Sequence, residues 1–201
     1  MTLYYAPRTR ATRPRWLLEE LGVPYELVRI DLATGGHKKP EYLAVHPLGV
    51  MPALKDGGQT LIESAAICLH LADKYPDKGL APLPGTPERG EYYQWILFGV
   101  ATVEPPLGDL FKLQVMTPAD KRDPAAIEAA KKKLGAALDV LRKAVAGKEY
   151  LVGGRFTVAD LMMGSMLSWA KSMELLGGHP ELAEYAKRQT GRPAFRKAIA
   201  D

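Results

Sequence analysis

Residues 49–71 read GVMPALKDGGQTLIESAAICLHL, and this stretch decides the fold. Strand-forming residues from Met51 to Lys55 and from Thr60 to Ile62 flank the turn sequence Asp56-Gly57-Gly58, which predicts an antiparallel hairpin. A helix is expected to open directly after the second strand, at Glu63-Ser64. An acid and a hydroxyl at a helix N-terminus, behind a proline that begins an edge strand, suit the binding of a small peptide.

The residues before this stretch predict the rest of a small sheet. Residues 2–5 and 25–31 are rich in strand formers, and between them a helix is expected to begin at the N-cap Thr12 and to end at Gly22. A helical crossover between two strands makes them parallel. With a further short helix at 40–45, the order predicts a mixed four-stranded sheet with helices on both faces.

The second half of the chain has a helical pattern throughout. A linker rich in proline and glycine at 77–87 separates an α/β domain at 1–76 from an all-α domain at 88–201. The first helix of the second domain is expected to run from Glu88 to about Gly108 and to be broken near its end by Pro105-Pro106. The later helices are expected at 125–145, capped by Asp123-Pro124, and at 157–176, 180–188 and 193–200.

Composition limits the classes of protein to consider. The chain has 201 residues, of which 47% are hydrophobic and 25% charged, as in a globular protein with a substantial core. No apolar run is long enough to span a membrane and no signal-peptide core is present, so we expect a cytoplasmic protein. The single cysteine, Cys68, excludes an internal disulfide and a cysteine-rich metal site, and we expect it to be buried packing.

Three motifs together resemble the soluble glutathione S-transferase superfamily. HPLGVMPAL at 46–54 is similar to the family segment N-P-x-G-x-V-P-x-L, and ESAAI at 63–67 matches its glutathione motif. FTVAD at 156–160 matches the capping motif of its helical domain. Thr157 and Asp160 form a capping box, and Asp160 is expected to be buried, structural and not catalytic. The resemblance covers essentially the full length and implies a thioredoxin-like domain followed by a helical domain that contributes the pocket for an electrophile.

The resemblance also implies how glutathione would be held. The family proline that matches Pro52 is cis, and the preceding residue, here Met51, pairs through its backbone with the cysteinyl part of glutathione. Ser64 and the helix N-terminus would bind the γ-glutamyl carboxylate, and Glu63 would bind the ammonium group. His37-Lys38 would bind the glycyl carboxylate. The alternatives are ordinary ones, a capping pair at Glu63-Ser64 and an exposed polar loop at His37-Lys38.

The resemblance offers two candidates for the residue that activates the glutathione sulfur, depending on which segment is aligned. Alignment on Tyr5-Ala6-Pro7 places Tyr5 at the phenol of the tyrosine-type classes. Alignment on the following helix places Thr9 at the hydroxyl of the serine-type classes, with Arg10 as an electrostatic helper. The cysteine of the cysteine-type classes would fall near Arg10, so that mechanism is not supported. We rank Thr9 first; helix capping is the alternative for Thr9, and a half-buried strand position is the alternative for Tyr5.

The function implied is conjugation of the glutathione thiolate to a small hydrophobic electrophile, as in detoxification, with glutathione as co-substrate and no metal. Glutathione-dependent peroxidase, dehalogenase or isomerase activity on the same fold is an alternative, and so is a non-catalytic binding or regulatory protein. The resemblance implies a homodimer. The formal charge of +4 is mild and no nucleic-acid motif is present, so neither a nucleic-acid partner nor a membrane is expected.

Overall fold

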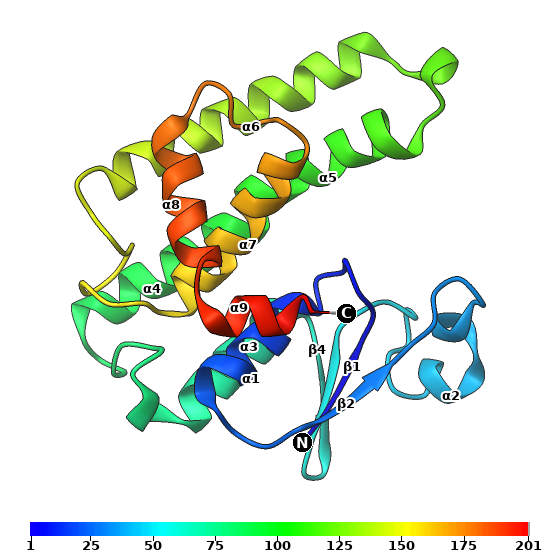
Figure 1. Cartoon of the computed structure of the whole chain (residues 1–201), viewed down its shortest axis with the longest axis vertical. Helices are drawn as coiled ribbons and strands as arrows, with labels where there is room; N and C mark the ends of the chain where they lie inside the picture. The colour runs from blue at the N-terminus through cyan, green and yellow to red at the C-terminus, as the bar shows by residue number, and fades with distance from the viewer. Residues whose placement is uncertain (201) are drawn as a thin grey trace. The chain divides into compact units, whose positions relative to one another are not determined.

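A computed structural model describes residues 1–200, which fold as two units (Figure 1). The first unit contains Met1–Ala81 together with the C-terminal segment that begins at Gly191. The second contains Pro82–Thr190, and its regular elements are helices. Among the residues described, no helix combines the length and the apolar character needed to cross a membrane.

The first unit is built on a mixed sheet with the strand order β2-β1-β3-β4. The strands are β1 (Thr2–Tyr5), β2 (Glu26–Arg29), β3 (Ala53–Asp56) and β4 (Gln59–Ile62). β1 runs parallel to β2, whereas β3 is antiparallel to both β1 and β4. The helical crossover after β1 produces the parallel pair and the two-residue turn after β3 produces the hairpin, so the predicted thioredoxin-like α/β sheet is confirmed.

Helices lie on both faces of this sheet (Figure 1). They are α1 (Thr12–Leu21), α2 (Pro40–Leu43) and α3 (Ser64–Lys74), with 3-10 turns at Gly36–Lys38 and Pro76–Lys78. α1 and α3 pack against each other and against the sheet. Consecutive strand residues point to opposite faces: Leu3 is fully buried, while the neighbouring Tyr4 ring contacts the Tyr42 ring of α2 in a tilted arrangement, with the ring centres 5.9 Å apart.

The start of α1 differs from the prediction. The residue before the helix is Ala11, and Thr12 is already its first helical residue. The helix therefore begins one residue earlier than predicted, when Thr12 was expected to be the N-cap. The Thr9 hydroxyl oxygen accepts the Ala11 N–H at 3.3 Å. The expected C-terminal end is confirmed, since Gly22 has a left-handed φ of 65° and its N–H bonds to the Leu18 carbonyl.

The C-terminal segment belongs with the α/β unit, whereas the sequence grouped it with the helical domain. The short helix α9 (Pro193–Ala198) packs on α1, where the Phe195 and Trp16 rings meet edge to face at 4.8 Å. Two hydrogen bonds of 2.6 and 2.8 Å join the Arg192 guanidinium to the Glu20 carboxylate. These partners are more than 170 positions apart, so local sequence patterns carry no signal for this contact.

The second unit is a set of helices joined by short connections. They are α4 (Pro87–Phe98), α5 (Glu104–Phe111), α6 (Pro124–Val145), α7 (Val158–Ser172) and α8 (Pro180–Thr190), with a 3-10 turn at Ala119–Lys121. π-helical segments follow α4 at Gly99–Val103 and α5 at Lys112–Met116. Asp123 caps α6 as predicted, because its carboxylate accepts from the N–H groups of Ala125 and Ala126.

Pro105 and Pro106 do not break the helix, which corrects the prediction. They lie in the first turn of α5, directly after the π-helical segment Gly99–Val103. A proline inside an α-helix removes an N–H that would bond four residues back. The wider π turn has already changed that bonding pattern, as the Glu104 N–H bonds to Gly99 O, so the chain continues through both prolines.

An acidic residue ties the β3–β4 hairpin to α3. The Asp56 carboxylate accepts hydrogen bonds of 2.6 Å from the Lys74 ammonium and contacts His70 Nε2 at 2.9 Å. Bonds from His70 and Lys74 hold the pKa of Asp56 below its ordinary value, and the bond to Asp56 raises the pKa of Lys74. The cluster therefore stabilises the fold in the ionised form of Asp56.

Replacing Asp56 with asparagine is expected to lower the urea midpoint of unfolding near neutral pH. Because the folded-state pKa of Asp56 is depressed, its contribution is complete above the ordinary carboxyl pKa of 3.8 and is lost as the pH falls through the lower folded value. The difference between wild type and variant should therefore shrink in acid. Urea unfolding at several pH values measures this, with the exposed Asp77→Asn as the control. A difference that does not change with pH would contradict the assignment.

Candidate functional site

Met51 and Pro52 lie immediately before β3 and are joined by a cis peptide bond, as predicted. The backbone pairing of β3 with Tyr4 and Ile62 begins only at Ala53, so Met51 lies beyond the paired part of the strand. Tyr42 of α2 supports this segment: its hydroxyl donates to the Val50 carbonyl at 2.6 Å. Burial raises the pKa of Tyr42 to about 12, so the hydroxyl remains a donor at physiological pH.

Glu63 and Ser64 lie where β4 turns into α3. Glu63 is exposed and has φ 70°, an uncommon value for a residue other than glycine. Its carbonyl accepts the Ile67 N–H at 2.9 Å, and Ser64 is the first helical residue. The first turn of a helix has N–H groups without intrahelical partners, so this corner can receive a carboxylate. Strained backbone at such a place is typical of binding sites.

Arg13 is the residue of this site that sequence reasoning missed. It lies on α1, only 2% of it is exposed, and its guanidinium donates to the Ser64 hydroxyl at 3.3 Å. The sequence contained one signal for this role: Arg13 lies three residues before Trp16, so the two share the buried face of the helix. The buried charge also acts on Cys68: burial raises the pKa of that thiol to about 12, and Arg13 opposes the shift. Cys68 is therefore a buried, protonated thiol, as expected.

The candidates for sulfur activation lie at the end of β1, where Tyr5 is the last residue, and on the connection to α1, which contains Thr9 and Arg10. Tyr5 is 6% exposed, and the Arg15 guanidinium lies 5.0 Å from the centre of its ring. The half-buried Thr9 hydroxyl donates to the Ala6 carbonyl at 2.7 Å, so it would have to rotate to donate to a thiolate. Arg10 is exposed. The structure thus places the three residues within six positions of one another along the chain.

His37 and Lys38 lie in the 3-10 turn Gly36–Lys38, next to the segment that leads to Met51. The Lys38 ammonium donates to the Leu48 carbonyl at 3.0 Å, which fixes the turn against that segment. The contact is close because Gly49 has no side chain: a Cβ there would lie 2.4 Å from the His37 carbonyl oxygen. Gly49 thus sets the distance between the two loops.

Gly49→Ala is expected to lower the free energy of unfolding by about 2 kcal/mol or more, because φ is 60° and the new Cβ meets backbone. Gly57→Ala is the matched control, since Gly57 has the same φ of 60° but open space around it. Its cost should be the conformational part alone, about 1 kcal/mol. Urea unfolding of both variants measures the two costs, and equal costs would show that the His37 contact does not matter.

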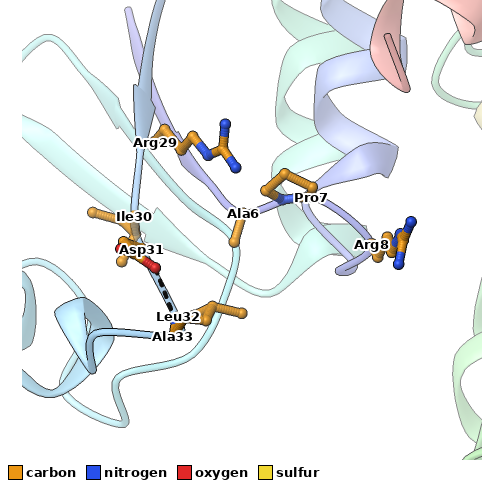
Figure 2. Close-up of a pocket in the computed structure, with 8 residues that line it drawn as sticks. All are labelled: Ala6, Pro7, Arg8, Arg29, Ile30, Asp31, Leu32 and Ala33. Carbon is orange, nitrogen blue, oxygen red and sulfur yellow. Dashed lines mark hydrogen bonds between the residues drawn. The ribbon is translucent and has the colours of Figure 1, made fainter. Parts of the chain in front are cut away.

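A cavity of about 370 Å³ opens where β1 and β2 end. Figure 2 shows its walls, one from the segment after β1 and one from the end of β2 and the loop that follows. The lining residues are Ala6, Pro7, Arg8, Arg29, Ile30, Asp31, Leu32 and Ala33. The cavity is therefore bounded on one side by the residues that directly precede Thr9. Local sequence patterns do not indicate this cavity, since its two walls are about 20 positions apart.

Comparison with known proteins identifies the family. The chain matches the model of the glutathione S-transferase N-terminal domain over residues 1–73 and that of the C-terminal domain over residues 124–188. It is 30% identical to glutathione S-transferase 3 of Zea mays, over 100% of this chain and 93% of the relative. It is also 30% identical to the disulfide-bond oxidoreductase YfcG of Escherichia coli (strain K12), over 98% of this chain and 93% of the relative.

A solved structure agrees with these matches. A sphingomonad glutathione S-transferase complexed with glutathione superposes with a TM-score of 0.85, at 32% identity, over 100% of this chain and 98% of the other. Fold, family models and full-length relatives thus agree with the motifs at 46–54, 63–67 and 156–160. The chain belongs to the glutathione S-transferase family.

Proposed function

We propose that this protein is a glutathione transferase that joins the glutathione thiolate to a small hydrophobic electrophile. The observation that carries the proposal is the corner at α3, where the Ser64 hydroxyl, held by the buried Arg13, meets the helix N-terminus beside Glu63. The relatives named as glutathione transferases and the glutathione complex of a solved relative support it.

Each part of glutathione has a matching group in this unit. The γ-glutamyl carboxylate would bind the first turn of α3 and Ser64, and the ammonium would pair with Glu63. The cysteinyl backbone would extend the sheet at Met51, whose backbone lies past the β3 ladder. The glycyl carboxylate would bind at His37 and Lys38. An ammonium has three donors, so the bond from Lys38 to Leu48 leaves two for a ligand.

Catalysis would consist mainly of orienting glutathione and stabilising its thiolate. A free thiol has a pKa of about 8.5, and each unit by which it is lowered requires about 1.4 kcal/mol of preferential stabilisation of the anion. One hydrogen bond to a charged group supplies about 1.5–3 kcal/mol. Thr9 is the proposed donor, with Arg10 adding positive charge and Tyr5 as the alternative donor.

Thr9→Val is expected to lower kcat with a chromogenic aryl halide about tenfold or more and to raise the pKa of the bound thiol by about one unit. Tyr5→Phe should have the smaller effect. Retention on immobilised glutathione, pH–rate profiles and the ultraviolet absorbance of the bound thiolate measure this. No retention and no turnover by the wild type would refute the transferase proposal. Full activity in both variants would refute only the assignment of the donor.

A second candidate activity is reduction of disulfides by glutathione, which the relative named as a disulfide-bond oxidoreductase favours. In that reaction two glutathione thiols are oxidised to one glutathione disulfide while the substrate disulfide is reduced to two thiols. An assay with a small disulfide, coupled to the measurement of glutathione disulfide, separates the two functions. Conjugation releases the leaving group of the electrophile and forms no glutathione disulfide.

We further propose a cytoplasmic homodimer, as the resemblance implies. Leu48 and Val50, on either side of Gly49, are 68% and 49% exposed, and burial of these apolar side chains in a dimer interface would be favourable. Light scattering across a range of protein concentrations tests the dimer, and cell fractionation tests the location.

A further inference from the structure

We propose that His46 is a positioning residue for glutathione: its neutral imidazole holds the segment that leads to Met51, so glutathione binds more weakly in mild acid. His46 lies just after α2 and opens the motif at 46–54, where the family segment has asparagine. An amide has no charged form near neutral pH, whereas an imidazole can gain a proton there. The inference rests on the proposed function and adds to it a pH dependence that comes from this chain's own residue.

The imidazole of His46 is enclosed by the protein. Only 2% of the residue is exposed, and the buried Nδ1 atom has no hydrogen-bond partner among residues 1–200. The backbone is fixed as well, since the His46 N–H donates to the Tyr42 carbonyl at 2.8 Å and the His46 carbonyl accepts the Gly49 N–H at 2.7 Å. A proton on this ring would place a charge in an enclosed site whose Nδ1 has no acceptor, which is costly.

Tyr42 connects this ring to the segment proposed to bind glutathione. The centres of the Tyr42 and His46 rings are 6.3 Å apart, with 31° between their planes. The Tyr42 hydroxyl donates to the Val50 carbonyl at 2.6 Å and lies 3.1 Å from the Met51 sulfur. A charged His46 ring that shifts toward water would therefore disturb Tyr42, and with it the backbone of Met51 that is proposed to pair with glutathione.

Three titratable side chains from neighbouring elements act on His46 or on the segment that follows it. Tyr42 of α2 stays neutral in the relevant range, because burial raises its pKa to about 12. Lys38, in the 3-10 turn, is held on the Leu48 carbonyl at 3.0 Å. Burial lowers the pKa of His46 below its ordinary value of 6.5, and the carboxylate of Glu63 partly opposes this shift. His46 is therefore neutral at physiological pH and gains its proton in mild acid.

Glu63 gives the protonation of His46 a direct effect on the ligand. In the proposed orientation, the ammonium of the γ-glutamyl group pairs with Glu63. A protonated His46 would bring a second positive charge to the same carboxylate, so the ammonium and the His46 proton disfavour each other. Because such coupling is reciprocal, bound glutathione lowers the pKa of His46 and acid lowers the affinity for glutathione. The affinity is complete above the ordinary histidine value and falls as the pH drops through the lower value of the folded protein.

The test uses S-methylglutathione, which has no thiol and keeps the charges of its termini between about pH 5 and pH 7. Calorimetry measures its binding to wild type, His46→Asn and the control His179→Asn, which changes a histidine of the second unit. From pH 7 to pH 5, wild type and the control should lose affinity about threefold to tenfold, the effect of about half a unit to one unit in the pKa of His46. His46→Asn should bind like wild type at pH 7 and change by less than about twofold.

A histidine NMR titration tests the same coupling without measuring an affinity. The chain has four histidines, so the resonance that is missing in His46→Asn identifies His46. If that variant does not fold, replacing the other three histidines one at a time identifies it by elimination. The pKa of His46 should lie below 6.5 in the free protein and about half a unit to one unit lower with saturating S-methylglutathione.

The outcomes separate this inference from the proposed function. No binding of S-methylglutathione at pH 7 would refute the glutathione site and this inference with it. Binding that does not change between pH 7 and pH 5, or that weakens equally in His46→Asn, would refute this inference alone. A His46 resonance with the same pKa in the free and the bound protein would do the same. If the circular dichroism signal is lost over this pH range, acid unfolding explains the fall in affinity and the inference is wrong.

Discussion

Asp160→Ala is expected to lower the free energy of unfolding by about 3–5 kcal/mol, a large part of the stability of a typical domain. The Asp160 side chain is completely buried and accepts four hydrogen bonds. The donors are the N–H groups of Leu151 and Thr157, the Thr157 hydroxyl at 3.1 Å and the Tyr185 hydroxyl at 2.7 Å. Alanine would leave these donors buried without an acceptor, and each such group costs about 1–3 kcal/mol.

The effect extends across the helical unit because the donors come from different elements. Leu151 lies in the loop before α7, Thr157 caps α7, and Tyr185 lies on α8. Urea unfolding monitored by circular dichroism measures the loss. Asp139→Ala is the control, since Asp139 is an exposed acid on α6 that lies 3.9 Å from Arg142. A loss below about 1 kcal/mol for Asp160→Ala would show that the four bonds are not needed. If that variant does not fold, Asp160→Asn, which keeps one acceptor oxygen, provides the intermediate value.

The capping box could be predicted from the sequence because it is a local feature. Thr157 and Asp160 are three residues apart, and a capping box depends only on that spacing. The hairpin at Asp56-Gly57-Gly58 was predictable for the same reason. The contacts that escaped prediction join distant segments: α9 packs on α1 through Phe195 and Trp16, and Tyr185 reaches Asp160 from another helix. Spacing patterns describe a helix or a turn, but they do not say which surfaces meet.

The same distinction applies to the candidate site. Met51-Pro52 and Glu63-Ser64 were found from the sequence, since the backbone groups of a strand edge and a helix N-terminus follow from the elements themselves. Arg13 was missed because its role depends on α1 packing against α3, which brings together residues about 50 positions apart. The loop between β1 and α1 is irregular, so the Thr9 hydroxyl was ranked above the Tyr5 phenol only by its place at the entry to α1.

Ser64→Ala is expected to raise the KM for glutathione about tenfold to hundredfold while kcat changes much less. The serine hydroxyl is 3.3 Å from the Arg13 guanidinium, which donates to it. An oxygen that accepts from a cation is a stronger donor, because hydrogen bonds polarise one another. A bond from such a donor to a carboxylate contributes about 1.5–3 kcal/mol of binding, which corresponds to this change in KM.

The split between KM and kcat is the informative part of the result. The γ-glutamyl end of glutathione is remote from the sulfur, so its contacts stabilise the bound ground state and the transition state equally. Their loss therefore raises KM and leaves kcat nearly unchanged. Ser64→Thr keeps the hydroxyl and should retain most of the affinity, whereas Ser172→Ala removes an exposed hydroxyl that donates to the Trp169 carbonyl and should change neither constant. Titration with S-methylglutathione measures binding without turnover. If Ser64→Ala lowers kcat and leaves that affinity intact, Ser64 acts at the sulfur and the proposed orientation of glutathione is reversed.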